Sequence, residues 1–68
     1  MSTMHAFPEP QQLVGTWRRF GLVGPVYEII EAGEERPDGN RTMKVRVLET
    51  GEEVEYSLLD ILDDPKER

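Results

Sequence analysis

Hydrophobic and polar residues alternate most regularly over residues 43–48 and 53–57. In the first stretch Met43, Val45 and Val47 fall on one side, and the cationic residues between them fall on the other. The second stretch alternates in the same way, with glutamates between its apolar residues. A period of two is that of a β-strand with one buried face, so the pattern predicts an antiparallel hairpin.

The register of this hairpin depends on the length of its loop. A loop of two or four residues centred on residues 50–51 pairs Val47 with Val54 and Val45 with Tyr56. A three-residue loop would shift the register by one and turn a whole face over, which places charged residues opposite apolar ones. An even loop is therefore predicted. The four-residue form with a left-handed glycine is preferred, because the preceding threonine disfavours positive φ.

A third strand is predicted over residues 26–31, which are rich in β-branched and aromatic side chains. Apolar residues fall on both of its faces, which is typical of a central strand or of a barrel strand covered by the N-terminal segment. Residues 33–40 then form a polar connection, in which Pro37, Asp38 and Gly39 have the chemistry of a type I turn.

A short helix is predicted after Ser57. Ser57 and Asp60 have the spacing of a capping box, and Pro65 ends the helix by pushing Asp64 into extended geometry. Asp63 and Asp64 then lie at the end of the helix where the dipole disfavours acidic residues. The local sequence offers no structural reason for that placement, so these carboxylates are candidates for a binding surface.

Residues 11–21 allow two interpretations. Read as a helix, they place Leu13, Trp17 and Phe20 on one face, but the glycine and threonine inside it are poor helix formers. Read as a strand, they have good β-propensity near Trp17, but Trp17 and Phe20 would then face opposite sides. Either interpretation makes Trp17 a core anchor, and the choice between helix and strand stays open.

These elements predict a mainly β fold with a minor helical part. It is a small antiparallel three-stranded meander, able to curl into an SH3-like partial barrel, with a short C-terminal helix and an N-terminal helix or strand. Residues 1–10 are expected to be a flexible tail and residues 11–66 a single small domain. The predicted core consists of Trp17, Phe20, Tyr27, Ile29, Met43, Val45, Val47, Val54, Tyr56, Leu58, Ile61 and Leu62.

Composition and net charge limit the classes of function that the protein can have. The chain has 68 residues, 14 acidic and 8 basic, with a net charge of −6 and no cysteine. Such acidity disfavours nucleic-acid binding, which depends on clustered Lys and Arg, and favours a basic protein partner. No apolar run approaches the roughly 20 residues of a membrane span, and no signal peptide is evident. A cytoplasmic protein without membrane attachment is expected.

Residues that could carry out chemistry are sparse. Nucleophilic catalysis needs a nucleophile, a base and an orienting group, but the single histidine, His5, lies in the expected tail. The best carboxylate cluster is Asp60, Asp63 and Asp64, which reads more simply as a solvated helix face than as a metal site. No catalytic residue, metal ligand or cofactor is therefore expected, and the protein is predicted not to be an enzyme.

The single aromatic–basic cluster is Trp17, Arg18, Arg19 and Phe20. Aromatic side chains stack on bases and arginines hold phosphates, so the cluster is a candidate nucleic-acid contact. The simpler interpretation is that the aromatic side chains pack while the arginines pair with acidic residues or contact a protein partner. The candidate partner-binding residues are Arg18, Arg19, Asp60, Asp63 and Asp64.

Several segments resemble a family of short bacterial proteins of unknown function. They are GPVYEI at residues 24–29, VLETGEEVEY at residues 47–56, LVGTWRRFG at residues 13–21 and the segment from Leu58 to Pro65. The resemblance covers about residues 13–65. It implies a bacterial, stand-alone small domain and carries no activity, cofactor or site residue to this chain.

The function predicted first is a non-enzymatic protein-interaction or regulatory module, which presents an acidic face or a sheet edge to a basic protein. One version of it is an antitoxin-like neutraliser. The alternative is a small-barrel nucleic-acid-binding module that uses the cluster from Trp17 to Phe20. The small predicted core is near the lower limit for independent folding, and a homodimer would relieve that limit.

Overall fold

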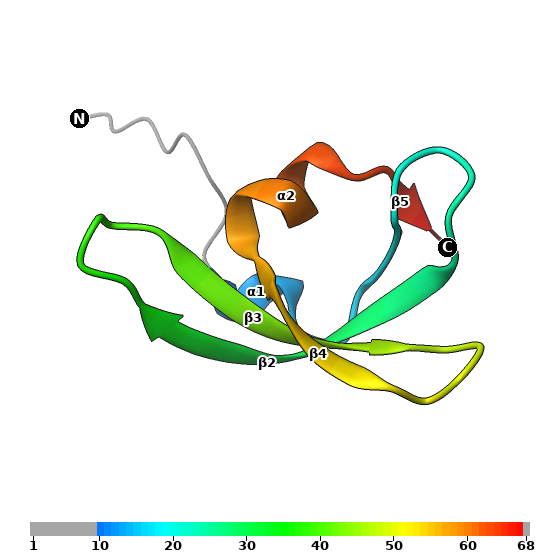
Figure 1. The fold of residues 1–68 in the computed structure, drawn as a ribbon, viewed down its shortest axis with the longest axis horizontal. Helices are drawn as coiled ribbons and strands as arrows, with labels where there is room; N and C mark the ends of the chain where they lie inside the picture. The colour runs from blue at the N-terminus through cyan, green and yellow to red at the C-terminus, as the bar shows by residue number, and fades with distance from the viewer. Residues whose placement is uncertain (1–9, 68) are drawn as a thin grey trace.

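The computed structural model describes residues 10–67. They form one open sheet of five antiparallel strands in the order β4-β3-β2-β1-β5, with two short helices (Figure 1). The elements in chain order are α1 (Pro10–Leu13), β1 (Trp17–Arg19), β2 (Val26–Glu35), β3 (Arg41–Val47), β4 (Glu53–Ser57), α2 (Leu58–Asp63) and β5 (Lys66–Glu67). The predicted mainly β class and the meander of β2, β3 and β4 are confirmed, and β1 and β5 extend the sheet beyond it.

The segment before β2 is a helix and a strand in succession. α1 ends at Leu13, after which Gly15 takes a φ of +91° and the hydroxyl of Thr16 donates to the Leu13 carbonyl at 2.6 Å. Since β1 alternates, Arg18 faces the core and Trp17 faces outward, with 40% of its surface exposed. The prediction that Trp17 anchors the core is wrong, and Leu13 takes that place with 6% exposure.

The hairpin of β3 and β4 has the predicted even loop in a different register. Val45 pairs with Val54 and Met43 with Tyr56, which is two residues away from the predicted pairing. Both registers keep apolar residues opposite apolar ones, so alternation does not distinguish them. The four-residue loop 48–51 closes through a bond from the amide of Gly51 to the carbonyl of Val47, 2.7 Å, with Gly51 at a φ of +77°. Gly51 is thus the last residue of the loop.

β2 is longer than predicted, because it continues through residues 32–35 into what reads in the sequence as a polar connection. A shift in register between Ile29 and Glu31 marks a β-bulge, which increases the local twist. A side chain on Gly33 would place a Cβ 2.5 Å from the carbonyl oxygen of Thr42, so the two strands approach closely there. The predicted turn at residues 37–39 is present.

α2 follows β4 without the predicted capping box. Ser57 has the extended geometry of an N-cap residue but makes no side-chain capping hydrogen bond. Asp64 is extended, with φ −83° and ψ 148°, as the following proline predicts. α2 lies over the concave side of the sheet in Figure 1. Within residues 10–67, no helix has the length and apolar character that crossing a membrane requires.

The core lies between the concave side of the sheet and the helices. Its buried members are Leu13, Tyr27, Ile29, Met43, Val45 and Ile61, and its half-buried members are Phe20, Ala32, Tyr56, Leu58 and Leu62. Val54, predicted to be in the core, lies on the edge strand and is 36% exposed. The expected tail falls outside the described residues except for Pro10, which begins α1.

Candidate functional site

The side chain of Asp64 is the centre of a polar network on the concave side of the sheet. Its carboxylate accepts hydrogen bonds from the hydroxyls of Tyr27 at 2.8 Å and Tyr56 at 3.1 Å, and from the backbone amide of Gly21 at 3.1 Å. Its backbone carbonyl accepts from the guanidinium of Arg18 at 2.9 Å. Asp64 therefore has a structural role, and tertiary contacts explain the position that the local sequence leaves unexplained.

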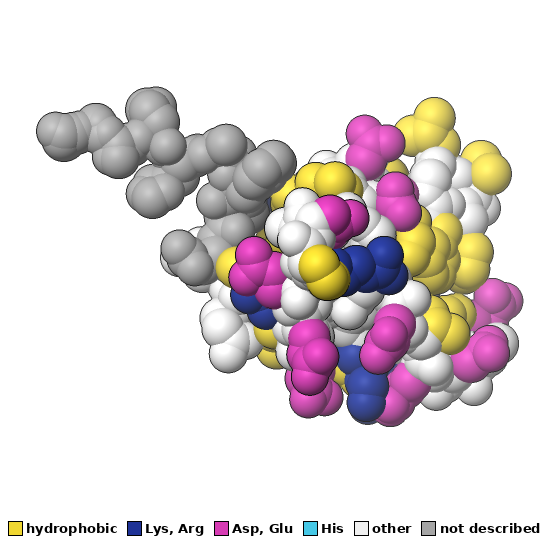
Figure 2. All heavy atoms as spheres, turned by 60° about the vertical axis from the view of Figure 1, so that its left-hand side comes forward, with side chains coloured by type: hydrophobic (Ala, Val, Ile, Leu, Met, Phe, Trp, Pro, Cys, Tyr) yellow, Lys and Arg dark blue, Asp and Glu magenta, His cyan; other side chains and the backbone are white. Residues whose placement is uncertain are grey.

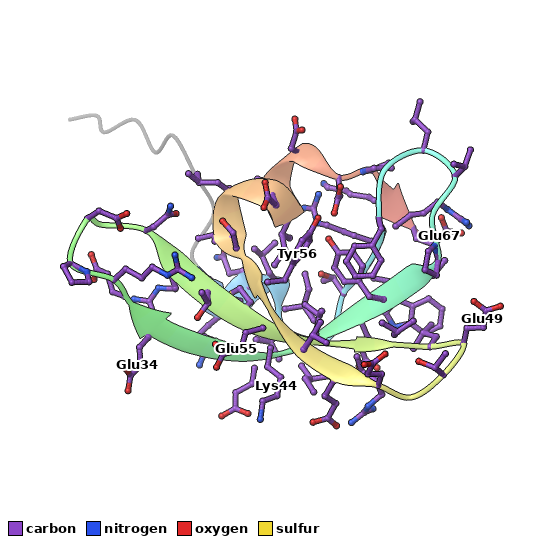
Figure 3. All side chains as sticks on the ribbon, viewed as in Figure 1. Glu34, Lys44, Glu49, Glu55, Tyr56 and Glu67 are labelled. Atoms are coloured by element: carbon purple, nitrogen blue, oxygen red, sulfur yellow. The ribbon has the colours of Figure 1, made fainter. Side chains whose placement is uncertain are left out.

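Three aromatic rings surround this network. The ring centroid of Phe20 lies 4.3 Å from that of Tyr27 and 5.1 Å from that of Tyr56, and the two tyrosine rings meet edge to face at 5.6 Å. Tyr27 is fully buried, and Tyr56 lies below α2 in Figure 3. Edge-to-face packing adds to the stability gained from burial, so the trio and Asp64 hold β2, β4 and the end of α2 together.

The two tyrosines are neutral hydroxyl donors. Burial and the hydrogen bond to Asp64 together raise the pKa of Tyr56 to about 12. Burial and the bond to Asp64 also raise the pKa of Tyr27 far above its usual value. Both effects favour the protonated form. The network therefore serves to position the chain and offers no proton acceptor among its hydroxyls.

The arginines of the aromatic–basic cluster are engaged within the fold. Arg18 is 6% exposed, and its Nε atom has no hydrogen-bond partner among the described residues. Arg19 forms an ion pair with Glu67 at 3.2 Å and donates to the carbonyl of Gly24 at 3.0 Å. Trp17 faces outward while Phe20 packs on the core, so the cluster does not form one surface.

The turn between β1 and β2 presents two aliphatic side chains to solvent. Leu22 is 86% exposed and Val23 is 95% exposed. The turn itself is tightly held, because Gly21 donates to Asp64 and has a φ of +66°. A Cβ on Gly24 would collide with the carbonyl oxygen of Phe20. The sequence predicts this turn from its glycines, but the exposure of the aliphatic pair does not follow from any periodicity.

Carboxylates outnumber cations on the outer face of the sheet, which is its convex side, opposite the core. Arg46 of β3 lies between Glu28, at 3.9 Å, and Glu53, at 3.3 Å. Lys44 of the same strand pairs with Glu31 at 3.9 Å and lies opposite Glu55 in the ladder. Figure 2 shows more acidic side chains than Lys and Arg side chains over the face of the molecule that it presents. The outer face is therefore acidic even after its ion pairs form.

The aspartates among the candidate residues lie in α2 or directly after it. Asp60 and Asp63 are exposed, whereas Asp64 is half-buried within its network. Residues 10–67 contain no group of three potential metal-ligating side chains. His5 lies outside the described residues.

A groove of about 570 Å³ runs beside the bulged part of β2, and its lining includes Glu31, Lys44 and Glu55.

The fold and these surfaces define a small, acidic, mainly β protein with one open sheet. Residues 4–68 match the family described as "Family of unknown function (DUF5397)". An uncharacterized protein of Haemophilus influenzae is 35% identical over 52 residues, which are 76% of this chain and 82% of that protein. The chain belongs to this family, and the predicted membership of a bacterial family of unknown function is confirmed.

Proposed function

We propose that the protein is a non-enzymatic interaction module that binds a basic protein through the acidic outer face of its sheet. The observation that carries this proposal is the excess of carboxylates over cations on that face. Four glutamates surround two cations there: Glu28, Glu31, Glu53 and Glu55 around Lys44 and Arg46. Complementary charge speeds association and selects partners, and the net charge of −6 acts in the same direction.

The placement of the predicted partner-binding residues divides them into two groups. Asp60 and Asp63 are exposed and can contribute to an acidic surface. Arg18, Arg19 and Asp64 contact other parts of the chain, so a direct contact with a partner would compete with those bonds. An antitoxin-like neutraliser of a basic protein is one version of this function. The cytoplasmic location stays a prediction.

Salt-titrated capture tests the proposal. The full chain is immobilised, a bacterial lysate is applied at low and at high salt, and bound proteins and nucleic acids are identified in parallel. We expect the column to capture a basic protein that can be identified. Its retention should fall as added salt shortens the Debye length, which is about 8 Å at physiological ionic strength. The double variant Glu53→Gln/Glu55→Gln is expected to lose retention. Asp60→Asn/Asp63→Asn is expected to lose less, because these residues are in α2, which lies over the concave side of the sheet.

The matched control is Glu34→Gln, which removes a carboxylate beyond the bulge of β2 (Figure 3). It is expected to retain the partner. Equal retention at low and high salt would contradict the proposal. Recovery of RNA or DNA in place of protein would favour the nucleic-acid alternative.

A further inference from the structure

We propose that the free edge of β4 binds an extended basic segment of the partner, which adds to the sheet as a further strand. This inference rests on the proposed function and names the site and the partner chemistry. β4 is the last strand in the order β4-β3-β2-β1-β5 and pairs only with β3 among the described residues. An edge strand with unpaired backbone groups is a template for strand addition.

The phase of the ladder shows which backbone groups are free. The amide of Val47 donates to the carbonyl of Glu52 at 2.8 Å, so these two residues form a hydrogen-bonded pair. Such pairs alternate along an antiparallel ladder, which directs the backbone groups of Val54 and Tyr56 toward β3. Those of Glu53, Glu55 and Ser57 therefore point away from β3, to the free edge. The residues with free backbone groups thus include both glutamates of β4.

The side chains of β4 specify the incoming strand. Glu53 and Glu55 lie on the outer face, and Figure 3 shows Glu55 beside Lys44 on the convex side of the sheet. Val54 lies on the other face and is 36% exposed, so a neighbouring strand would cover it. A complementary strand alternates cationic and apolar residues. β3 has this pattern on the occupied edge, where Lys44, Val45 and Arg46 lie opposite Glu55, Val54 and Glu53.

Charge also selects between possible occupants. Two copies of β4 placed edge to edge would bring Glu53 and Glu55 of one copy against those of the other, and like charges across strands are destabilising. Each copy also carries a net charge of −6. Within the described residues no ion pair forms at Glu55, because the ammonium of Lys44 pairs with Glu31. The occupant is therefore a basic segment of another protein.

A peptide with the pattern of β3 tests this inference on the isolated chain. The probe is a capped TMKVRVL peptide, which copies residues 42–48, titrated into the ¹⁵N-labelled 68-residue protein. We expect the largest amide shift changes in residues 53–57. We also expect Glu55→Gln to weaken binding about two- to five-fold, as loss of one exposed ion pair does, while Glu34→Gln leaves it unchanged.

A second peptide separates strand addition from simple charge attraction. Its three central amides are N-methylated, so it keeps the side chains and charges but cannot donate hydrogen bonds from the centre of the strand. We expect its binding to fall by at least about ten-fold, the effect of losing more than one net hydrogen bond. No binding by the first peptide, shift changes away from β4, or equal binding of both peptides would overturn strand addition. Salt-dependent capture of a basic protein would still stand in each case.

Discussion

Asp64 accepts hydrogen bonds from parts of the chain that are far apart in sequence, so we expect its replacement to destabilise the fold. Asp64→Asn removes the negative charge to which the hydroxyls of Tyr27 and Tyr56 donate. It also introduces an amide NH₂ group, which is itself a donor and cannot accept from these hydroxyls. We expect a loss of about 1–3 kcal/mol in the free energy of unfolding, measured with urea. Asp63→Asn, one residue earlier and exposed, is expected to change it by less than about 0.5 kcal/mol. Equal effects of the two variants would contradict the network.

The tyrosines of this network also predict an alkaline limit to stability. In the unfolded chain tyrosine titrates near pH 10, whereas the pKa of folded Tyr56 is about 12 and that of Tyr27 is raised as well. Above about pH 10 the folded state therefore holds more protons than the unfolded state, so stability is full below that pH and falls as the pH rises toward 12. Urea midpoints across this range should decrease. Tyr56→Phe should flatten the decrease, and a midpoint independent of pH would refute the assignment.

Trp17 shows why burial could not be predicted residue by residue. Its size favours the core, but the side chains of β1 alternate, so that Trp17 faces outward and Arg18 faces inward. We expect Trp17→Ala to cost clearly less than the 2–5 kcal/mol expected for Ile61→Ala, because Ile61 is fully buried and Trp17 is 40% exposed. Thermal unfolding of both variants provides the comparison. A larger loss for Trp17→Ala would restore its role as an anchor.

At the scale of elements, alternation was enough to predict β3, β4 and the even loop between them. It could not predict the offset, because a shift of two residues keeps each side chain on the same face of the sheet and again places Val54 and Tyr56 opposite apolar residues of β3. The position of Gly51 at the end of the loop decides the register, and that depends on backbone geometry. β5, Lys66–Glu67, has only two residues and therefore no periodicity to recognise. It forms because Pro65 directs the chain back along β1, where its carbonyl accepts from the amide of Arg19 at 3.0 Å.

Substitutions in the turn between β1 and β2 should show that its backbone conformation contributes more to stability than its exposed side chains do. Gly24→Ala brings a Cβ against the carbonyl oxygen of Phe20, so we expect it to destabilise the protein by about 1–3 kcal/mol. Leu22→Ser and Val23→Ser are expected to change stability by less than about 0.5 kcal/mol, since both side chains are exposed. Chemical denaturation of the three variants measures this. A stable Gly24→Ala variant would show that the turn can rearrange.

For the whole molecule, the excess of negative charge opposes the compact state. With a net charge of −6, added sodium chloride should screen self-repulsion and raise the melting temperature by a few degrees, which corresponds to less than about 1 kcal/mol. Glu53→Gln/Glu55→Gln should reduce this dependence. Sodium chloride suits the test better than sulfate, because sulfate strengthens hydrophobic burial in any protein. A melting temperature that falls with sodium chloride would argue against net repulsion.

The candidate surfaces were predictable to different extents. The acidic character of β4 and its cationic partners on β3 follow from alternation, since Glu53, Glu55, Lys44 and Arg46 occupy the polar positions of their strands. The Asp64 network could not be predicted from the sequence, because it joins residues separated by up to 46 positions in the chain. An unfavourable position in the helix dipole did single out Asp64, but its explanation is a tertiary contact that no local pattern contains.

The outward position of the single tryptophan has a consequence for spectroscopy. Its side chain is already 40% exposed in the folded state, so its fluorescence should change less on unfolding than that of a fully buried tryptophan. Near-ultraviolet circular dichroism of Tyr27 and Tyr56 should follow the loss of packing instead. Trp17 lies on β1, where it pairs with Glu28 of β2 and Glu67 of β5. Because β1 is two strands away from β3 and three from β4, the emission of Trp17 is a local probe. A ligand that shifts the emission of Trp17 therefore binds on the β1 side of the sheet.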